Sequence, residues 1–271
     1  MTHNQLDNQY RPKSSPRTLS FAFLLIFCSF LALHEVANGQ LPNLLCGKRY
    51  LDKGDVIKLW CEDAKLTMPE TFNSTSVFPE ITSIYITCPN AETRNYCNVM
   101  HTNVSALPYR ANLFDVQLQG FQSGDDNPIP VGRFLANNKL VIYRLHIKFS
   151  RIGRVDRNFL AGFHALRWLH LDDNDIVDVS VDAFASVTPV GGRPVLDDIR
   201  LDRNALQRLD WAAFYPLRKS LWMLTLSSQT PKLRALTLST TPFPTTIRIL
   251  DLTQNLLESV PNWILYNRKC H

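Results

Sequence analysis

The chain has 271 residues, of which 45% are hydrophobic, so it is long and apolar enough to bury a sizeable core. This composition excludes an intrinsically disordered chain. Lysine and arginine (29) outnumber aspartate and glutamate (24), which gives a net charge of +5, and no block of like charge occurs. Because nucleic-acid-binding proteins carry clustered positive charge, we expect no nucleic-acid partner.

Residues 1–39 are predicted to be a signal peptide. Basic residues precede the uncharged apolar run Phe21–Leu33. Its thirteen residues are too few for a membrane span of roughly 20 residues and fit a secretory signal. Ala37 and Gly39 supply the small residues that a signal peptidase requires. We therefore expect cleavage after Gly39 and a secreted, extracellular protein with no membrane span after cleavage; a signal anchor is the alternative.

Residues 40–100 are predicted to form a disulfide-bearing N-terminal cap. The cysteines of this segment are Cys46, Cys61, Cys88 and Cys97. In an oxidising compartment four cysteines form two disulfides, and the sequence leaves all three connectivities open. A zinc site is not expected, because even the closest pair, Cys88 and Cys97, is nine residues apart.

Two asparagines and one further cysteine are candidate modification sites. The sequons at Asn73 and Asn103 are predicted to carry sugars. Cys270 lies in the short tail 269–271, which resembles the beginning of a truncated C-terminal cap. Three roles stay open for Cys270: a free thiol, a cysteine in an intermolecular disulfide with an extracellular partner, or the first cysteine of that cap.

A repeat organises residues 101–268. Apolar residues recur at offsets 0, 3, 5 and 10 from the start of each copy, with a polar residue at offset 8. Clear copies begin at Ile142, Leu166, Leu196, Leu221 and Ile247, and weaker copies begin at Ile81 and Leu113. The alternation around offsets 3 and 5 predicts a short strand with one buried face in each copy.

The polar residue at offset 8 is predicted to pair the main-chain groups of the turn that follows each strand. Asn174, Asn204 and Asn255 form such a ladder, which we expect to be imperfect at Ser150 and Gln229. Apolar residues further along each copy are predicted to fill the convex side of the core: Leu160, Phe184, Phe214 and Leu265.

This spacing resembles the extracellular leucine-rich repeat, L-x-x-L-x-L-x-x-N-x-L, most clearly in LRWLHLDDNDI and LDDIRLDRNAL. The resemblance implies an α/β repeat solenoid: a leucine-rich repeat horseshoe with a parallel concave sheet and a disulfide-bearing N-terminal cap. The chain is also similar to arthropod proteins labelled as the non-catalytic leucine-rich subunit of a shrimp luciferin monooxygenase. Because leucine-rich repeat proteins mostly grip other proteins, the resemblance implies a protein-binding scaffold.

No catalytic chemistry is expected. The sequence contains no nucleophile elbow, P-loop, zinc-binding histidine pair, calcium loop or glycine fingerprint. We therefore expect no catalytic residue, no metal and no cofactor. The run 172–175 is dense in carboxylates, but the repeat places Asn174 in the ladder and Asp172 and Asp173 on the exposed concave face. A solvated face is therefore expected there in preference to a calcium site.

The concave face is the predicted binding surface, because offsets 2, 4, 6 and 7 point away from the core. The expected partner-binding residues are His146, Trp168, His170, Asp172, Asp198, Arg200, Met223 and Asp251. Trp168, His170 and Arg200 are predicted to anchor a protein partner, since exposed aromatic residues beside charges are typical of binding hot spots. We expect His170 to add pH sensitivity between about pH 5 and 8.

Two other functions remain open at this stage. The chain is a non-catalytic subunit that supports a secreted enzyme, or it is the ectodomain fragment of a cell-surface receptor. A further alternative is that the concave face is an ordinary surface with no binding role, because single exposed apolar residues are common on protein surfaces. The sequence does not identify the partner.

Overall fold

The computed structural model describes residues 82–88, 112–122, 129, 131–187, 195–237 and 246–258, together with the backbone of three short strands before residue 99. The predicted signal segment, the sequons at Asn73 and Asn103, Leu265 and Cys270 lie outside these residues. Within this part of the chain, no helix is long and apolar enough to cross a membrane.

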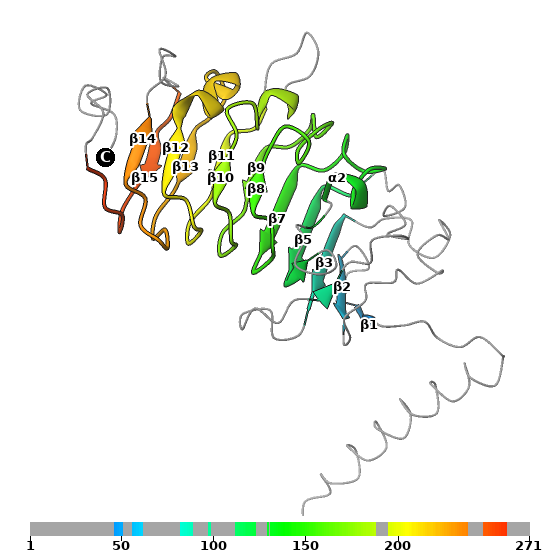
Figure 1. Ribbon diagram of the computed structural model, residues 1–271. Helices are drawn as coiled ribbons and strands as arrows, with labels where there is room; N and C mark the ends of the chain where they lie inside the picture. Colours follow the sequence, from blue (N-terminus) through cyan, green and yellow to red (C-terminus); the bar gives the residue numbers. More distant parts are fainter. Residues whose placement is uncertain are drawn as a thin grey trace, which may run out of the picture. The chain divides into compact units, whose positions relative to one another are not determined.

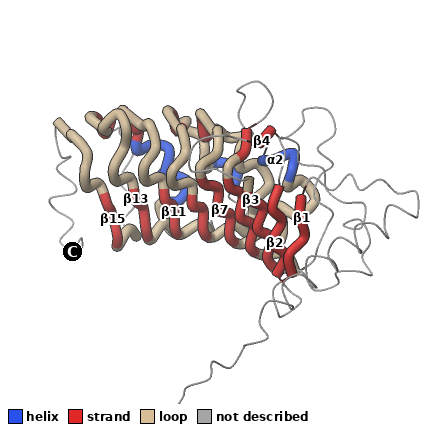
Figure 2. Tube along the Cα trace, turned by 90° about the horizontal axis from the view of Figure 1, so that it is seen from below, coloured by secondary structure: helices blue, strands red, loops and turns tan. Residues whose placement is uncertain are grey.

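A nine-stranded sheet runs along the array, and Figure 2 shows its strands lying side by side. The strands, in their order across the sheet, are β1 (Cys46–Tyr50), β2 (Val56–Cys61), β3 (Ser83–Thr87), β5 (Asp115–Gln119), β7 (Arg144–Lys148), β9 (Trp168–His170), β11 (Asp198–Arg200), β13 (Met223–Thr225) and β15 (Ile249–Asp251). β1 is antiparallel to β2, and every later pair in this sheet is parallel. The five clear copies and the two weaker ones each supply one parallel strand.

The return segments between these strands form a second layer of short elements (Figure 1). They include paired strands, β4 (Cys97–Asn98) with β6 (Phe121–Gln122), β8 (Arg154–Val155) with β10 (Asp178–Val179), and β12 (Arg208–Asp210) with β14 (Ala235–Thr237). They also include the helical turns α2 (Val131–Phe134), η3 (Ala185–Val187) and η4 (Trp211–Leu217). Short return elements allow each copy to reach the next strand in about 25 residues.

The core lies between the large sheet and the return segments. The predicted apolar positions of the clear copies have no exposed surface in the middle of the array, at Leu160, Leu169, Leu171, Phe184, Ile199, Leu201 and Phe214. Phe184 stacks on Phe214 in the next copy, with ring centroids 5.3 Å apart. Each such buried side chain contributes roughly 1.5–3 kcal/mol to folding.

An amide ladder joins successive copies behind the sheet. Asn204 Oδ1 accepts a hydrogen bond from the Ile176 amide at 3.2 Å, and Asn204 Nδ2 donates to the Leu171 carbonyl at 2.8 Å. Asn174 and Asn255 bond to main-chain groups of their preceding copies in the same way. These bonds satisfy main-chain groups that the turn would otherwise bury unpaired.

The ladder continues where asparagine is absent, which differs from the sequence expectation. Gln229 Oε1 accepts from the Leu206 amide at 3.1 Å, and its Nε2 donates to the Leu201 carbonyl at 2.8 Å. The longer glutamine side chain therefore reaches the same kind of partners. Ser150 is shorter: its hydroxyl accepts from the Phe121 amide at 3.1 Å but donates only within its own copy.

A left-handed residue precedes each ladder residue. These residues have φ values between 48° and 59°, at Phe149, Asp173, Arg203, Ser228 and Gln254. Gly120 occupies the same place in the weaker copy, with φ 83°. Five non-glycine residues thus adopt a conformation that costs about 1–2 kcal/mol for most side chains, because the turn needs it.

Candidate functional site: the face of the nine-stranded sheet

Side chains on the outer face of the sheet form two rows because the strand register is constant. The first row is Arg144, Trp168, Asp198, Met223 and Ile249, and the second row is His146, His170, Arg200, Thr225 and Asp251. Neighbouring strands lie roughly 4.8 Å apart, so members of one row contact each other. The structure thus brings all the predicted binding residues onto one face, with Asp172 two residues after the end of β9.

Trp168 lies under a guanidinium group in the middle of the first row. Arg144 Cζ is 3.7 Å from the centroid of the indole ring, and Tyr143 approaches the same ring edge-on at 6.1 Å. Trp168 itself is half-buried. The cation over its face covers part of the aromatic surface that the sequence had suggested was open.

Two histidines lie beside each other in the second row. The rings of His146 and His170 meet edge-on with centroids 4.3 Å apart. Burial and the neighbouring His170 lower the pKa of His146 to about 4, so its ring is neutral at pH 7. His170 Nε2 lies 3.4 Å from a carboxylate oxygen of Asp198, and Arg200 reaches the same oxygen at 3.4 Å. The Asp198 carboxylate therefore holds residues from two strands.

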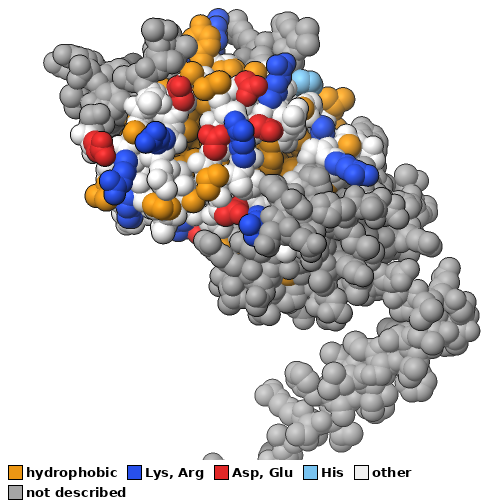
Figure 3. All heavy atoms as spheres, viewed as in Figure 1, with side chains coloured by type: hydrophobic (Ala, Val, Ile, Leu, Met, Phe, Trp, Pro, Cys, Tyr) orange, Lys and Arg blue, Asp and Glu red, His pale blue; other side chains and the backbone are white. Residues whose placement is uncertain are grey.

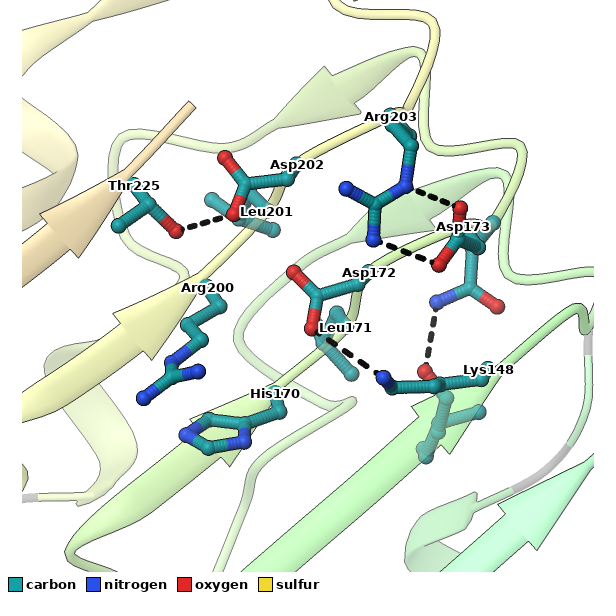
Figure 4. Close-up of polar contacts among 12 residues, drawn as sticks. Lys148, His170, Leu171, Asp172, Asp173, Arg200, Leu201, Asp202, Arg203 and Thr225 are labelled. Carbon is teal, nitrogen blue, oxygen red and sulfur yellow. Dashed lines mark hydrogen bonds and ion pairs between the residues drawn. The ribbon is translucent and has the colours of Figure 1, made fainter. Parts of the chain in front are cut away.

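Three of the predicted binding residues are buried, which corrects the expectation of a fully solvated face. The exposed fractions are 8% for His170, 5% for Asp172 and 9% for Asp198. Asp198 lies beside both His170 and Arg200, and Asp172 lies beside Lys148. Asp172 lies 3.9 Å from Lys148 Nζ (Figure 4), and burial together with the charge of Asp202 raises its pKa. These groups hold the face together more than they offer contacts to a partner.

The carboxylates near the ends of β9 and β11 also serve internal links, as Figure 4 shows. Asp173 forms a two-point ion pair with Arg203 of the next copy, in which Nη2 and Oδ2 are 2.8 Å apart. Asp202 accepts from the Thr225 hydroxyl at 2.6 Å, and Asp175 accepts from two main-chain amides of the preceding copy at 2.7 and 3.0 Å. Within the described ranges, no group of three or more His, Cys, Asp or Glu residues could hold a metal ion.

The far end of the face is more open and more apolar. Ile249 is 39% exposed and Met223 is half-buried. Asp251 is also half-buried, and its carboxylate accepts from the amide and the hydroxyl of Thr253.

A hollow of about 390 Å³ opens on the same face near β3, β5 and β7. Among the residues that line it are Tyr85, Gln117, Gln119, His146 and Lys148. These groups offer hydrogen bonds and one cation.

Sequence reasoning missed the residues at offset 1, directly before each strand. They are aromatic or charged in every clear copy: Tyr143, Arg167, Asp197, Trp222 and Arg248. Their regular recurrence was visible in the sequence. It was overlooked because offset 1 does not alternate with the buried positions of the strand.

The constant register and the amide ladder agree with the comparison to solved structures. The crystal structure of the TLR13–ssRNA13 complex is similar, with a TM-score of 0.57 and 21% identity over 79% of this chain and 27% of that chain. The fold is a leucine-rich repeat solenoid. The Toll–Spatzle complex of Drosophila aligns with a TM-score of 0.46 and 15% identity, over 84% of this chain and 41% of that chain. No family model and no curated protein matches the chain.

The expectation that nucleic acid is excluded as a partner is wrong. TLR13 is described in complex with ssRNA13, so a leucine-rich repeat solenoid of similar fold does bind nucleic acid. The argument from net charge fails because a repeat array presents long local surfaces. The charge of one such surface is independent of the mean charge of the chain.

Proposed function

We propose that this chain is a secreted leucine-rich repeat scaffold that binds a protein partner on the face of its nine-stranded sheet and performs no catalysis. The observation that carries the proposal is the first row. Trp168 lies half-exposed on β9, and Met223 on β13 and the exposed Ile249 on β15 follow in the same row after the buried Asp198 of β11. Aromatic and apolar side chains aligned on a face and bordered by charges are typical of protein-binding hot spots.

Internal pairing prepares this face for binding. Asp198 holds His170 and Arg200, and Arg144 lies over Trp168, so these side chains are ordered before a partner arrives. A preordered face loses less conformational entropy on binding than a flexible one. The buried charges therefore support binding indirectly, by fixing the side chains around Trp168.

Secretion rests on the predicted signal segment and the cysteines of the predicted cap. The similar solved structures are of receptor leucine-rich repeat proteins rather than enzymes, which supports a binding role. The alternative of a subunit that supports an enzyme, such as the leucine-rich subunit of a luciferin monooxygenase, gains no support from these comparisons.

Site-specific photo-crosslinking tests the proposal. A photo-reactive amino acid replaces Met223 on the sheet face in one version of the secreted full chain. In the matched version it replaces Val181, which is 56% exposed on the return side. Each version is incubated with extracellular fluid from the source tissue and irradiated, and the adducts are identified by mass spectrometry.

We expect a discrete protein adduct at position 223 and none of comparable yield at position 181. Equal adducts at both positions, or adducts at position 181 alone, would contradict binding through the sheet face. A nuclease-sensitive adduct at position 223 without a protein adduct would contradict the class of partner.

A further inference from the structure

The residues directly before the strands form a continuous row of their own. This strand-start row consists of Phe114, Tyr143, Arg167, Asp197, Trp222 and Arg248. From Tyr143 onward, each member donates its main-chain N–H to the carbonyl of the member before it, at distances from 2.8 to 3.0 Å. The backbone of the row is therefore fixed by hydrogen bonds between copies.

The row is exposed although it lies next to the core. Leu221, directly before Trp222, has no exposed surface, whereas Trp222 is 47% exposed and Phe114 is 40% exposed. Arg167 and Arg248 are also exposed. Aromatic side chains and arginine are enriched among the residues that contribute most to protein binding, and here the backbone that carries them is fixed by hydrogen bonds.

In the first half of the strand-start row, neighbouring side chains pair with one another. Arg167 lies over the Tyr143 ring at 5.4 Å, and its Nε donates to Asp197 Oδ2 at 2.8 Å. The charge of Arg167 is therefore neutralised by Asp197. Asp197, the single acidic member of the row, is thereby paired with Arg167.

The side chains in the second half of the strand-start row do not pair in this way. Among the described residues, neither the Trp222 ring nor the Arg248 guanidinium takes part in a ring contact, a cation–π contact, an ion pair or a side-chain hydrogen bond. The Asp251 carboxylate, on the strand that follows Arg248, accepts hydrogen bonds from Thr253 instead. Met223 and Ile249 lie beside these two residues on the same strands. We name Trp222, Met223, Arg248 and Ile249 the Trp222 patch.

We propose that the Trp222 patch seats an acidic polypeptide segment that carries apolar or aromatic side chains. Arg248 offers a cation to a carboxylate, and the uncovered Trp222 ring with Ile249 offers an apolar surface. This inference rests on the proposed function and names its partner chemistry. It adds Trp222 to the proposed binding face in addition to Trp168, part of whose ring Arg144 covers.

The order of residues in the row favours a polypeptide over a single-stranded nucleic acid. A nucleic acid strand stacks its bases on successive aromatic rings and needs cations along its phosphates. Here Arg167 and Asp197 stand between the aromatic residues Tyr143 and Trp222, so the rings do not follow one another along the row, and Arg167 is already paired with Asp197 and offers no free cation to a phosphate. One aromatic side chain beside one free arginine fits a short acidic segment better.

Binding of defined polymers tests this inference. The probes are a random copolymer of glutamate and tyrosine, a copolymer of lysine and tyrosine, and poly(U) RNA. The full chain is compared with Arg248→Glu and Trp222→Ala. Arg208→Glu, at an exposed arginine on β12, is the matched control. Thermal unfolding of each variant verifies that the fold is intact.

We expect the glutamate–tyrosine copolymer to bind the unchanged protein and the lysine–tyrosine copolymer not to bind. Arg248→Glu should weaken binding at least tenfold, Trp222→Ala by a similar factor, and Arg208→Glu by less than twofold. Binding should also weaken at 0.5 M salt, because screening reduces the attraction between exposed charges.

Absence of copolymer binding, or equal loss in the Arg208→Glu control, would overturn the inference. Binding of poly(U) alone, lost in the same variants, would also overturn it in favour of RNA. If the copolymer fails but crosslinking at position 223 recovers a protein, the proposed function stands and only the Trp222 patch is misassigned.

Discussion

Arg144 lies over the ring of Trp168, with its Cζ atom 3.7 Å from the ring centroid. A second pair of this kind occurs on the return side, where Arg218 Cζ is 4.3 Å from the centroid of Tyr215. The two pairs share the same cation–π contact, worth about 0.5–1 kcal/mol at an exposed site. They differ in location, because only the first lies on the sheet face that we propose for binding.

The buried side of the strands is the part of the fold most sensitive to substitution. Leu201→Asp places a carboxylate at a position with no exposed surface, and we expect it to cost about 4 kcal/mol or more and to abolish secretion of folded protein. Leu256→Asp, at a leucine that is 59% exposed, is the control and should be tolerated. Thermal unfolding and yield measure the effect; equal yield of both variants would mean that the strand register is wrong.

The amide ladder gives a second stability prediction. Gln229→Leu leaves the buried Leu206 amide without its partner and removes one of the two donors to the Leu201 carbonyl, which keeps Asn204 Nδ2, so we expect a loss of about 1–3 kcal/mol. Gln254→Leu, at an exposed glutamine of the neighbouring turn, should cost less than about 1 kcal/mol. Urea denaturation compares the two; equal losses would argue against a ladder through Gln229.

The sequence predicted the fold in detail because the repeat itself determines it. Offsets 3 and 5 identified the buried face, so Leu169 and Leu201 were assigned to the core correctly. The effect of Gln229 was not foreseen, since the reach of one side chain depends on how closely two copies stack. The left-handed backbone at Asp173 and Arg203 was also missed. Aspartate adopts this conformation more often than most residues, but arginine does not, so the residue types gave no consistent signal.

The candidate site was predictable only in outline. The rows of the sheet face follow from the repeat register, and the structure shows them as expected. The exposure of these side chains could not be predicted from the repeat register, because it depends on which side chains pair across strands. Asp198 is buried since His170 and Arg200 both turn toward it, a contact that no spacing rule contains.

His146 gives a pH prediction. Burial and the neighbouring His170 lower its pKa to about 4, below the unfolded value of 6.5. The unfolded chain therefore binds a proton near pH 6.5 that the folded chain does not bind until about pH 4. This contribution to stability is fully present above pH 6.5, and about 3 kcal/mol of it is lost between pH 6.5 and pH 4.

The variant His146→Gln isolates this effect. Other charged groups near His146 are kept in both proteins: Asp115, Arg144, Lys148, His170 and Arg200. Urea denaturation between pH 4 and pH 7 should show a shallower loss of stability for the variant than for the unchanged protein. Parallel curves would show that His146 keeps an ordinary pKa.

The backbone register suggests a disulfide pattern. Cys46 and Cys61 are opposite each other on antiparallel strands β1 and β2, a separation that a disulfide can span. Cys88 is disulfide-bonded. We therefore predict the pairs Cys46–Cys61 and Cys88–Cys97. Peptide mapping without reduction tests this, and a Cys46–Cys88 or Cys61–Cys88 peptide would contradict it.

Binding of the protein partner identified by crosslinking, measured for Trp168→Ala and Tyr215→Ala, tests the central claim most directly. Each substitution removes an aromatic ring beside an arginine, and only Trp168 lies on the sheet face. We expect Trp168→Ala to raise the Kd at least tenfold, about 1.4 kcal/mol, and Tyr215→Ala to change it by less than twofold. An unchanged Kd for Trp168→Ala together with a raised Kd for Tyr215→Ala would show that the partner binds elsewhere.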